Sequence, residues 1–125
     1  MRLLLDTHVL LWWLMNDPSL TTKARSAIAN PETSVFVSAA SAWEIAIKQA
    51  LGKLEAPSDL EQQIVLNGFA PLSITIGHAY SAGTLPRHHD DPFDRVLVGQ
   101  AMSEGLTVVT RDPRLQRYGV ATMLA

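Results

Sequence analysis

The sequence lacks the residues that several classes of functional site require. It has no cysteine, which excludes disulfide bonds, zinc–thiolate sites and a thiol nucleophile. It also lacks a strong excess of charge, since 10 Lys and Arg face 12 Asp and Glu, for a net charge of −2. This balance argues against a protein that holds nucleic acid by charge alone. It leaves open an enzyme that acts on nucleic acid.

Long apolar runs are absent as well. None approaches the roughly 20 residues that cross a bilayer. Asp6 and His8 interrupt the apolar stretch behind Arg2, so that stretch is not typical of a signal peptide. We therefore expect a cytoplasmic protein with no membrane segment. Its 125 residues and hydrophobic content of 47% fit a single domain, residues 1–125, with a substantial core.

Short apolar or β-branched runs alternate with helical patterns along the chain. The runs predicted as strands are Arg2–Leu5, Ser34–Val37, part of 70–74, Leu106–Thr110 and Val120–Leu124. The predicted helices cover 7–15, 22–30, 38–51, 57–66, 75–82 and 93–104, with a last helical turn after Asp112. This alternation predicts an α/β fold, a three-layer α/β/α sandwich around a mostly parallel sheet.

Four acids are predicted to meet at the carboxyl edge of this sheet. Asp6 and Asp112 each follow a strand, Glu44 lies two turns into the helix after the second strand, and Asp94 opens a helix at the same end. Crowded carboxylates repel unless a cation or a shared proton offsets their charge, and Mg²⁺ or Mn²⁺ suits an all-oxygen site. Such sites activate water for phosphodiester cleavage.

Each acid also has a simpler interpretation. Asp6, Asp91 and Asp112 each precede a helix, where a side-chain oxygen caps free backbone N–H groups. Glu44 lies four residues before Lys48 and could pair with it on a helix surface. Taken singly, a structural role is the commoner one. The convergence of the acids is what points to chemistry.

The histidines and the neighbouring arginines give weaker signals. His8 is expected in the core with its hydrogen bonds satisfied, and His78 on a helix surface. A solvated loop is slightly favoured for the pair His88-His89 over a basic rim around the acids. The arginines that could complete such a rim and contact phosphates are Arg87, Arg95 and Arg111. The adjacent tryptophans at 12 and 13 are expected in the core or in a subunit interface.

Four motifs in this order and spacing resemble a known family. They are LLLDTHVLLWWL, SAASAWEIAIK, HHDDPFDRVLVGQA and LTVVTRDPRL, and together they run from residue 1 to about residue 120. The sequence is similar to PIN-domain proteins, and more narrowly to the VapC-like toxin ribonucleases of bacterial type II toxin–antitoxin pairs. The resemblance implies an α/β/α sandwich and an Mg²⁺- or Mn²⁺-dependent endoribonuclease.

The resemblance also implies roles for individual residues. Asp6, Glu44, Asp94 and Asp112 match the acids of the family's metal site, and Asp91 is an additional acid that could support or replace one of them. Hydroxyl groups near the site are expected at positions 7 and 110, both threonine here. Family members are commonly homodimers, and a small antitoxin inhibits them, often with an arginine that pairs with the acids.

Other functions remain open at this point. A phosphatase of the haloacid dehalogenase type also begins with a strand that ends in Asp, but it requires a second Asp where this chain has His8. A catalytically silent PIN-like module would bind RNA or a protein without cleaving anything. A nuclease acting on DNA or on structured RNA, with no toxin role, is a further variant. Metal binding would distinguish the silent module from the nucleases.

Overall fold

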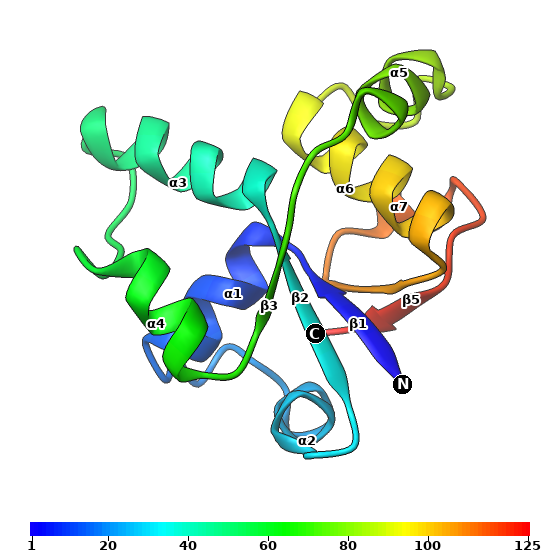
Figure 1. The fold of residues 1–125 in the computed structure, drawn as a ribbon. Helices are drawn as coiled ribbons and strands as arrows, with labels where there is room; N and C mark the ends of the chain where they lie inside the picture. Colours follow the sequence, from blue (N-terminus) through cyan, green and yellow to red (C-terminus); the bar gives the residue numbers. More distant parts are fainter.

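A computed structural model describes residues 1–125 and contains one five-stranded sheet with every neighbouring pair parallel (Figure 1). The strands are β1 (Arg2–Leu5), β2 (Ser34–Ser38), β3 (Ala70–Leu72), β4 (Thr107–Thr110) and β5 (Thr122–Leu124). Their order across the sheet is β3-β2-β1-β4-β5, so the first strand of the chain is the central one. The prediction of a mostly parallel sheet is confirmed, and the observed sheet is wholly parallel.

Seven helices connect and cover these strands. They are α1 (Thr7–Leu14), α2 (Thr22–Ala29), α3 (Ala39–Ala50), α4 (Leu60–Leu66), α5 (Ile76–Thr84), α6 (Pro92–Glu104) and α7 (Pro113–Gln116). The predicted bounds agree to within about two residues except for α4, which begins three residues later than expected. Asp59, just before α4, has φ −107° and ψ 43°, and its side chain makes no capping bond. Pro57 and Ser58 therefore precede the helix rather than open it.

The two faces of the sheet carry separate apolar clusters. In β1, Leu3 and Leu5 point into one cluster while Leu4 points into the other, as the alternation of side chains along a strand requires. The first cluster includes buried residues of α1, α2, α3 and α4, and the second includes buried residues of α6 and α7. Helix α5 packs against α6 (Figure 1). The predicted three-layer sandwich is confirmed.

Local sequence signals set where the helices near the site begin and end. The Ser38 hydroxyl accepts from Ala40 N at 3.0 Å and opens α3. Asp91 accepts from Phe93 N at 2.8 Å and opens α6, with a proline as its first residue. Gly105 ends α6 in the left-handed conformation, with φ 67°, which costs glycine little because it has no Cβ. These caps place the first turns of both helices at the carboxyl edge of the sheet.

Two of the histidine predictions are wrong. His8 is exposed, because α1 buries Thr7 and the run from Val9 to Leu11 and leaves position 8 on its outer side. His78 is buried, with 3% of its surface exposed. Its ring is the second half of a capping box, in which Nδ1 accepts from Thr75 N at 3.1 Å. Its Nε2 lies 3.2 Å from Glu104 Oε1, so the ring joins α5 to α6.

The tryptophans pack as predicted for core residues. Trp12 and Trp13 are partly buried against the cluster that contains Leu3 and Leu5. Trp13 Nε1 donates to Asn67 Oδ1 at 2.9 Å, which satisfies the indole N–H beside the apolar contact.

Candidate metal centre

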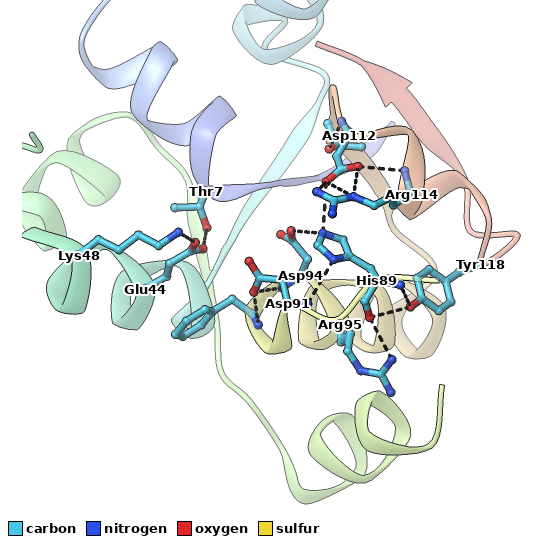
Figure 2. A network of polar contacts seen from close by, with 12 residues as sticks. Thr7, Glu44, Lys48, His89, Asp91, Asp94, Arg95, Asp112, Arg114 and Tyr118 are labelled. Atoms are coloured by element: carbon cyan, nitrogen blue, oxygen red, sulfur yellow. Dashed lines mark hydrogen bonds and ion pairs between the residues drawn. The ribbon is translucent and has the colours of Figure 1, made fainter. Parts of the chain in front are cut away.

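The structure brings the four predicted acids together at the carboxyl edge of the sheet. Asp6 follows β1, Glu44 lies in α3 behind β2, and Asp112 follows β4. Asp94 lies in the first turn of α6, and Figure 2 shows its side chain between those of Glu44 and Asp112. Burial is the main cause that raises the pKa of Asp94, to about 7, and the charges of Asp91, Asp6, Glu44 and Asp112 raise it further.

Asp6 acts both as a helix cap and as a member of this group. Its Oδ1 accepts from Val9 N at 2.8 Å, as the N-cap of α1. The side chain is almost fully buried, with 7% of the residue exposed. Burial raises the pKa of Asp6, opposed by a side-chain hydrogen bond with Thr110 and by the Val9 amide. Asp6 therefore caps α1 as expected and also lies among the acids at the sheet edge.

Glu44 is held from two sides. The Thr7 hydroxyl donates to Oε1 at 2.6 Å, and Lys48 forms an ion pair with Oε2 across one turn of α3. Only 3% of Glu44 is exposed. Its carboxylate hydrogen bond raises the pKa of Lys48. The hydroxyl at position 7 thus orients an acid of the cluster. The expected pairing with Lys48 also forms, but Glu44 is buried and not on a solvated helix face.

Asp112 differs from Asp94 in its electrostatic surroundings. It caps α7 by accepting from Arg114 N at 2.9 Å. The Arg114 guanidinium also grips the carboxylate, with Nη2 at 2.8 Å from Oδ2 and Nε at 3.0 Å from Oδ1. These hydrogen bonds lower the pKa of Asp112 to about 2. The Thr110 hydroxyl accepts from Asp112 N at 3.0 Å, so Thr110 links Asp112 to Asp6.

Asp91 is the N-cap of α6. Its Oδ1 accepts from Phe93 N at 2.8 Å and from Asp94 N at 3.4 Å. It therefore fixes the first turn of the helix that carries Asp94, and its charge contributes to the raised pKa of Asp94. The geometry favours a supporting role for Asp91.

His89 belongs to the site although the sequence favoured a solvated loop for it, and that prediction is wrong for His89. Only 6% of the residue is exposed, whereas the adjacent His88 is exposed. Its Nε2 lies 2.9 Å from Asp94 Oδ2 and 3.2 Å from Asp112 Oδ2 (Figure 2). The only signal in the sequence was that His89 lies two residues before the helix cap Asp91. Sequence spacing does not reveal which of two adjacent side chains points into the protein.

Two of the three arginines of the predicted basic rim donate hydrogen bonds to the protein's own backbone. Arg95 donates to five backbone carbonyl groups, those of Ala82, Gly83, Leu85, Pro86 and His89. Arg111 donates to the carbonyl groups of Ser19 and Ala125, and its guanidinium lies 4.4 Å from the ring centroid of Trp12. Arg87 is exposed beside a small polar depression that Asp90 and Arg95 also line. Both Arg95 and Arg111 donate to carbonyl groups that lie beyond the regular hydrogen bonds of the helices and strands.

The donor set fits a hard divalent cation. Carboxylate oxygens of Asp94 and Asp112 lie within 4.8 Å of each other, and Nε2 of His89 lies between them. The nearby carboxylates of Asp6 and Glu44 add negative charge that raises the pKa of Asp94. Carboxylate oxygens are the ligands that Mg²⁺ and Mn²⁺ take. A cation here would offset a charge that otherwise holds one carboxyl partly protonated near neutral pH.

Comparisons with known proteins agree with this architecture. The sequence model of the PIN domain matches residues 3–121. Ribonuclease VapC22 of Mycobacterium tuberculosis is 31% identical over 118 residues, which cover 92% of this chain and 90% of that protein. No helix of the structure combines the length and the apolar character needed to cross a membrane.

Solved structures share the fold. VapBC2 from Rickettsia felis, bound to a DNA fragment from its promoter, superposes with a TM-score of 0.72 at 14% identity, covering 98% of each chain. DNA-bound VapBC from Salmonella typhimurium superposes with a TM-score of 0.66 at 21% identity, covering 98% of this chain and 97% of that one. At these identities the likeness concerns the fold alone.

Proposed function

Because the chain belongs to the PIN domain family, we propose that it is a divalent-metal-dependent endoribonuclease that hydrolyses RNA phosphodiester bonds. The observation that carries this proposal is the meeting of four carboxylates from four separate segments at one sheet edge. Burial and, after it, the charges of the neighbouring acids raise the pKa of Asp94 there to about 7. Lys48, Arg114 and the raised pKa of Asp94 offset part of this charge in the metal-free protein, and a bound divalent cation would offset the rest.

In this proposal Asp6, Glu44, Asp94 and Asp112 hold the cation, which is Mg²⁺ or Mn²⁺. The bound cation supplies water activation and offsets the charge that develops on the phosphate. Asp91 keeps Asp94 in place through the first turn of α6. In the metal-free protein the pKa of Asp94 is raised and that of Asp112 is lowered, so Asp94 is the carboxyl from which a binding cation would displace a proton near neutral pH.

Other side chains orient the acids and meet the substrate. Thr7 and Lys48 hold Glu44, and Thr110 links Asp6 with Asp112. Arg87 and the exposed Arg114, which pairs with Asp112, remain the cations best placed for RNA phosphates, since Arg95 and Arg111 donate to backbone carbonyl groups.

The proposed biological role is that of the toxin in a type II toxin–antitoxin pair. Several proteins of the same fold were solved as VapBC or toxin–antitoxin complexes. We propose a cognate antitoxin that places a cationic side chain among the acids, which would replace the metal as their counter-charge. We also propose a homodimer or a larger assembly, because α3 exposes Trp43 and Ile47 one turn apart.

The first test is RNA cleavage by purified protein in Mn²⁺, in Mg²⁺ and in EDTA, with Asp6→Asn beside the wild type. Asn keeps an oxygen that can cap α1 but removes the charge. We expect cleavage to require metal and to fall at least about a hundredfold in Asp6→Asn. Asp59→Asn is the control, because Asp59 makes no capping bond and lies outside the cluster.

The second candidate is a catalytically silent module that binds RNA or a partner protein. The buried carboxylates favour an enzyme, because a silent module has no need to keep mutually repelling acids together. Retained RNA binding without cleavage in any metal, together with no detectable Mn²⁺ binding, would favour the silent module. Cleavage that survives both EDTA and Asp6→Asn would reject the proposed site.

A further inference from the structure

His89 is fixed in the loop between α5 and α6 by contacts along its backbone. Its N–H donates to the Tyr118 hydroxyl at 3.0 Å. Its carbonyl accepts from Arg95 Nη1 at 3.3 Å. The ring is buried, with 6% of the side chain exposed. The imidazole is therefore held in one place relative to the acids rather than carried on a free loop.

A hydrogen bond assigns the tautomer of this ring. Asp91 N donates to His89 Nδ1 at 3.2 Å. A nitrogen that accepts cannot also carry the proton of a neutral imidazole, so that proton lies on Nε2. The atom facing the acids is thus a donor. For Nε2 to bind a metal, the proton would have to move to Nδ1, where it would face the Asp91 N–H and break that bond.

Nε2 lies between carboxylates from two different elements. It is 2.9 Å from Asp94 Oδ2 in α6 and 3.2 Å from Asp112 Oδ2 behind β4. Despite these distances it forms no aligned hydrogen bond with either oxygen, and it is closed off from solvent. The donor faces two carboxyl groups in a space that suits a cation. A buried N–H without an aligned partner destabilises the fold, so the presence of a histidine at this position calls for an explanation.

We propose that His89 is a positioning residue that takes the place of the cation between Asp94 and Asp112 in the metal-free protein. Its Nε2–H offsets part of the charge of both carboxylates and keeps the two facing oxygens apart at a fixed spacing. A divalent cation then competes with His89 for these oxygens, so His89 lowers the metal affinity of the site. This inference rests on the proposed metal-dependent function.

Mn²⁺ binding measured by calorimetry and by electron paramagnetic resonance of the free ion tests this role without any activity assay. The proteins compared are the wild type, His89→Ala, His89→Gln and His88→Ala. Gln at 89 keeps an amide N–H near the position of Nε2. His88 is the matched control, because it is the exposed neighbour and its ring meets Tyr118 edge-on at 5.0 Å.

We expect His89→Ala to bind Mn²⁺ about tenfold more tightly than the wild type, because the cation no longer displaces a donor from two charged groups. His89→Gln and His88→Ala should bind as the wild type does. Equal or weaker Mn²⁺ binding by folded His89→Ala would overturn the inference, and weaker binding would make His89 a ligand. If neither the wild type nor His89→Ala binds Mn²⁺, the metal site of the proposed function fails as well.

Thermal melting gives a second measure for the same proteins. In EDTA we expect His89→Ala to melt below the wild type, because the two carboxylates lose their shared donor. Saturating Mn²⁺ should reduce this difference, since the cation replaces the donor. If the difference in melting temperature stays the same in Mn²⁺, His89 has a merely structural role. If the difference grows, His89 is a metal ligand. Either outcome would reject the proposal.

Discussion

At the scale of single residues, three acids of the candidate site also stabilise the starts of helices. Asp6, Asp91 and Asp112 each accept a hydrogen bond from a backbone N–H in the first turn of a helix. The same interaction fixes where each carboxylate lies. Asparagine retains the capping oxygen and removes the charge, so Asp→Asn variants separate the two roles in a way that Asp→Ala cannot.

The raised pKa of Asp94 predicts how stability depends on pH in the metal-free protein. The ordinary value of 3.8 rises to about 7 on folding, so the folded protein holds a proton that the unfolded chain releases. The stabilisation is complete below about pH 4 and is lost as the pH rises through 7. The groups that face this carboxyl are His89, Asp91, Asp6, Glu44 and Asp112.

We therefore expect Asp94→Asn to be more stable than the wild type in EDTA at about pH 8.5, by a few kcal/mol or roughly 5–10 °C. The difference should shrink steadily as the pH falls toward 4. Melting followed by circular dichroism across this pH range measures it, with Asp59→Asn as the control. A difference that does not change with pH would contradict the assignment.

At the scale of elements, the sequence predicted the strands and most of the helices because their signals are local. Apolar runs, caps and prolines lie within a few residues of the element that they define. The ring of His78 pairs with Glu104, 26 residues away, and the ring of His89 with Asp112, 23 residues away. Such partners are set by packing, which no local pattern reveals.

The close packing of α5 on α6 predicts an asymmetric response of two helical glycines. A Cβ on Gly99 would lie 3.2 Å from both Ala82 N and the carbonyl oxygen of His78. These are backbone atoms that cannot move aside, so Gly99→Ala should destabilise by about 1–3 kcal/mol. Gly83→Ala meets nothing within 4 Å and should be neutral or slightly stabilising. Urea unfolding of both variants measures this, and equal effects would contradict it.

Arg95 predicts a second property of the same region. Its five carbonyl contacts tie the end of α5 and the following loop to α6. We expect Arg95→Gln to speed trypsin cleavage after Arg87 by about tenfold or more, because the loop opens more easily. The exposed Arg117→Gln should leave that rate unchanged. If the rate of trypsin cleavage is unchanged in Arg95→Gln, the carbonyl contacts do not hold the loop closed. Arg95 would then again be a candidate for RNA binding.

At the scale of the whole molecule, the sheet edge that carries the site followed from the alternation of strands and helices. Parallel strands bring their carboxyl ends to one edge, so the approach of Asp6, Glu44 and Asp112 could be predicted without coordinates. The roles of Arg95 and Arg111 could not be predicted in the same way. The backbone carbonyl groups that accept their hydrogen bonds are brought to them only by the folding of the chain.

The exposed apolar residues of α3 predict self-association. Trp43 and Ile47 are 62% and 37% exposed and lie one turn apart. Light scattering should show a mass that rises with concentration toward that of a dimer, and Trp43→Glu should weaken the association at least about tenfold. Leu66→Glu, at an exposed apolar position of α4, is the control. A monomer at every concentration would remove α3 as an interface.

The strand order β3-β2-β1-β4-β5 also determines when the site is completed during synthesis. The central strand pairs on one side with β2 and on the other with β4, which emerges from the ribosome much later. Glu44 and Asp112 are 68 residues apart (112 − 44), which at roughly 5–20 residues per second separates them by about 3–14 seconds. Throughout that interval the nascent chain holds two of the four acids or three, never all of them. The full cluster of acids therefore cannot form until all but the last 13 residues (125 − 112) of the chain have been synthesised.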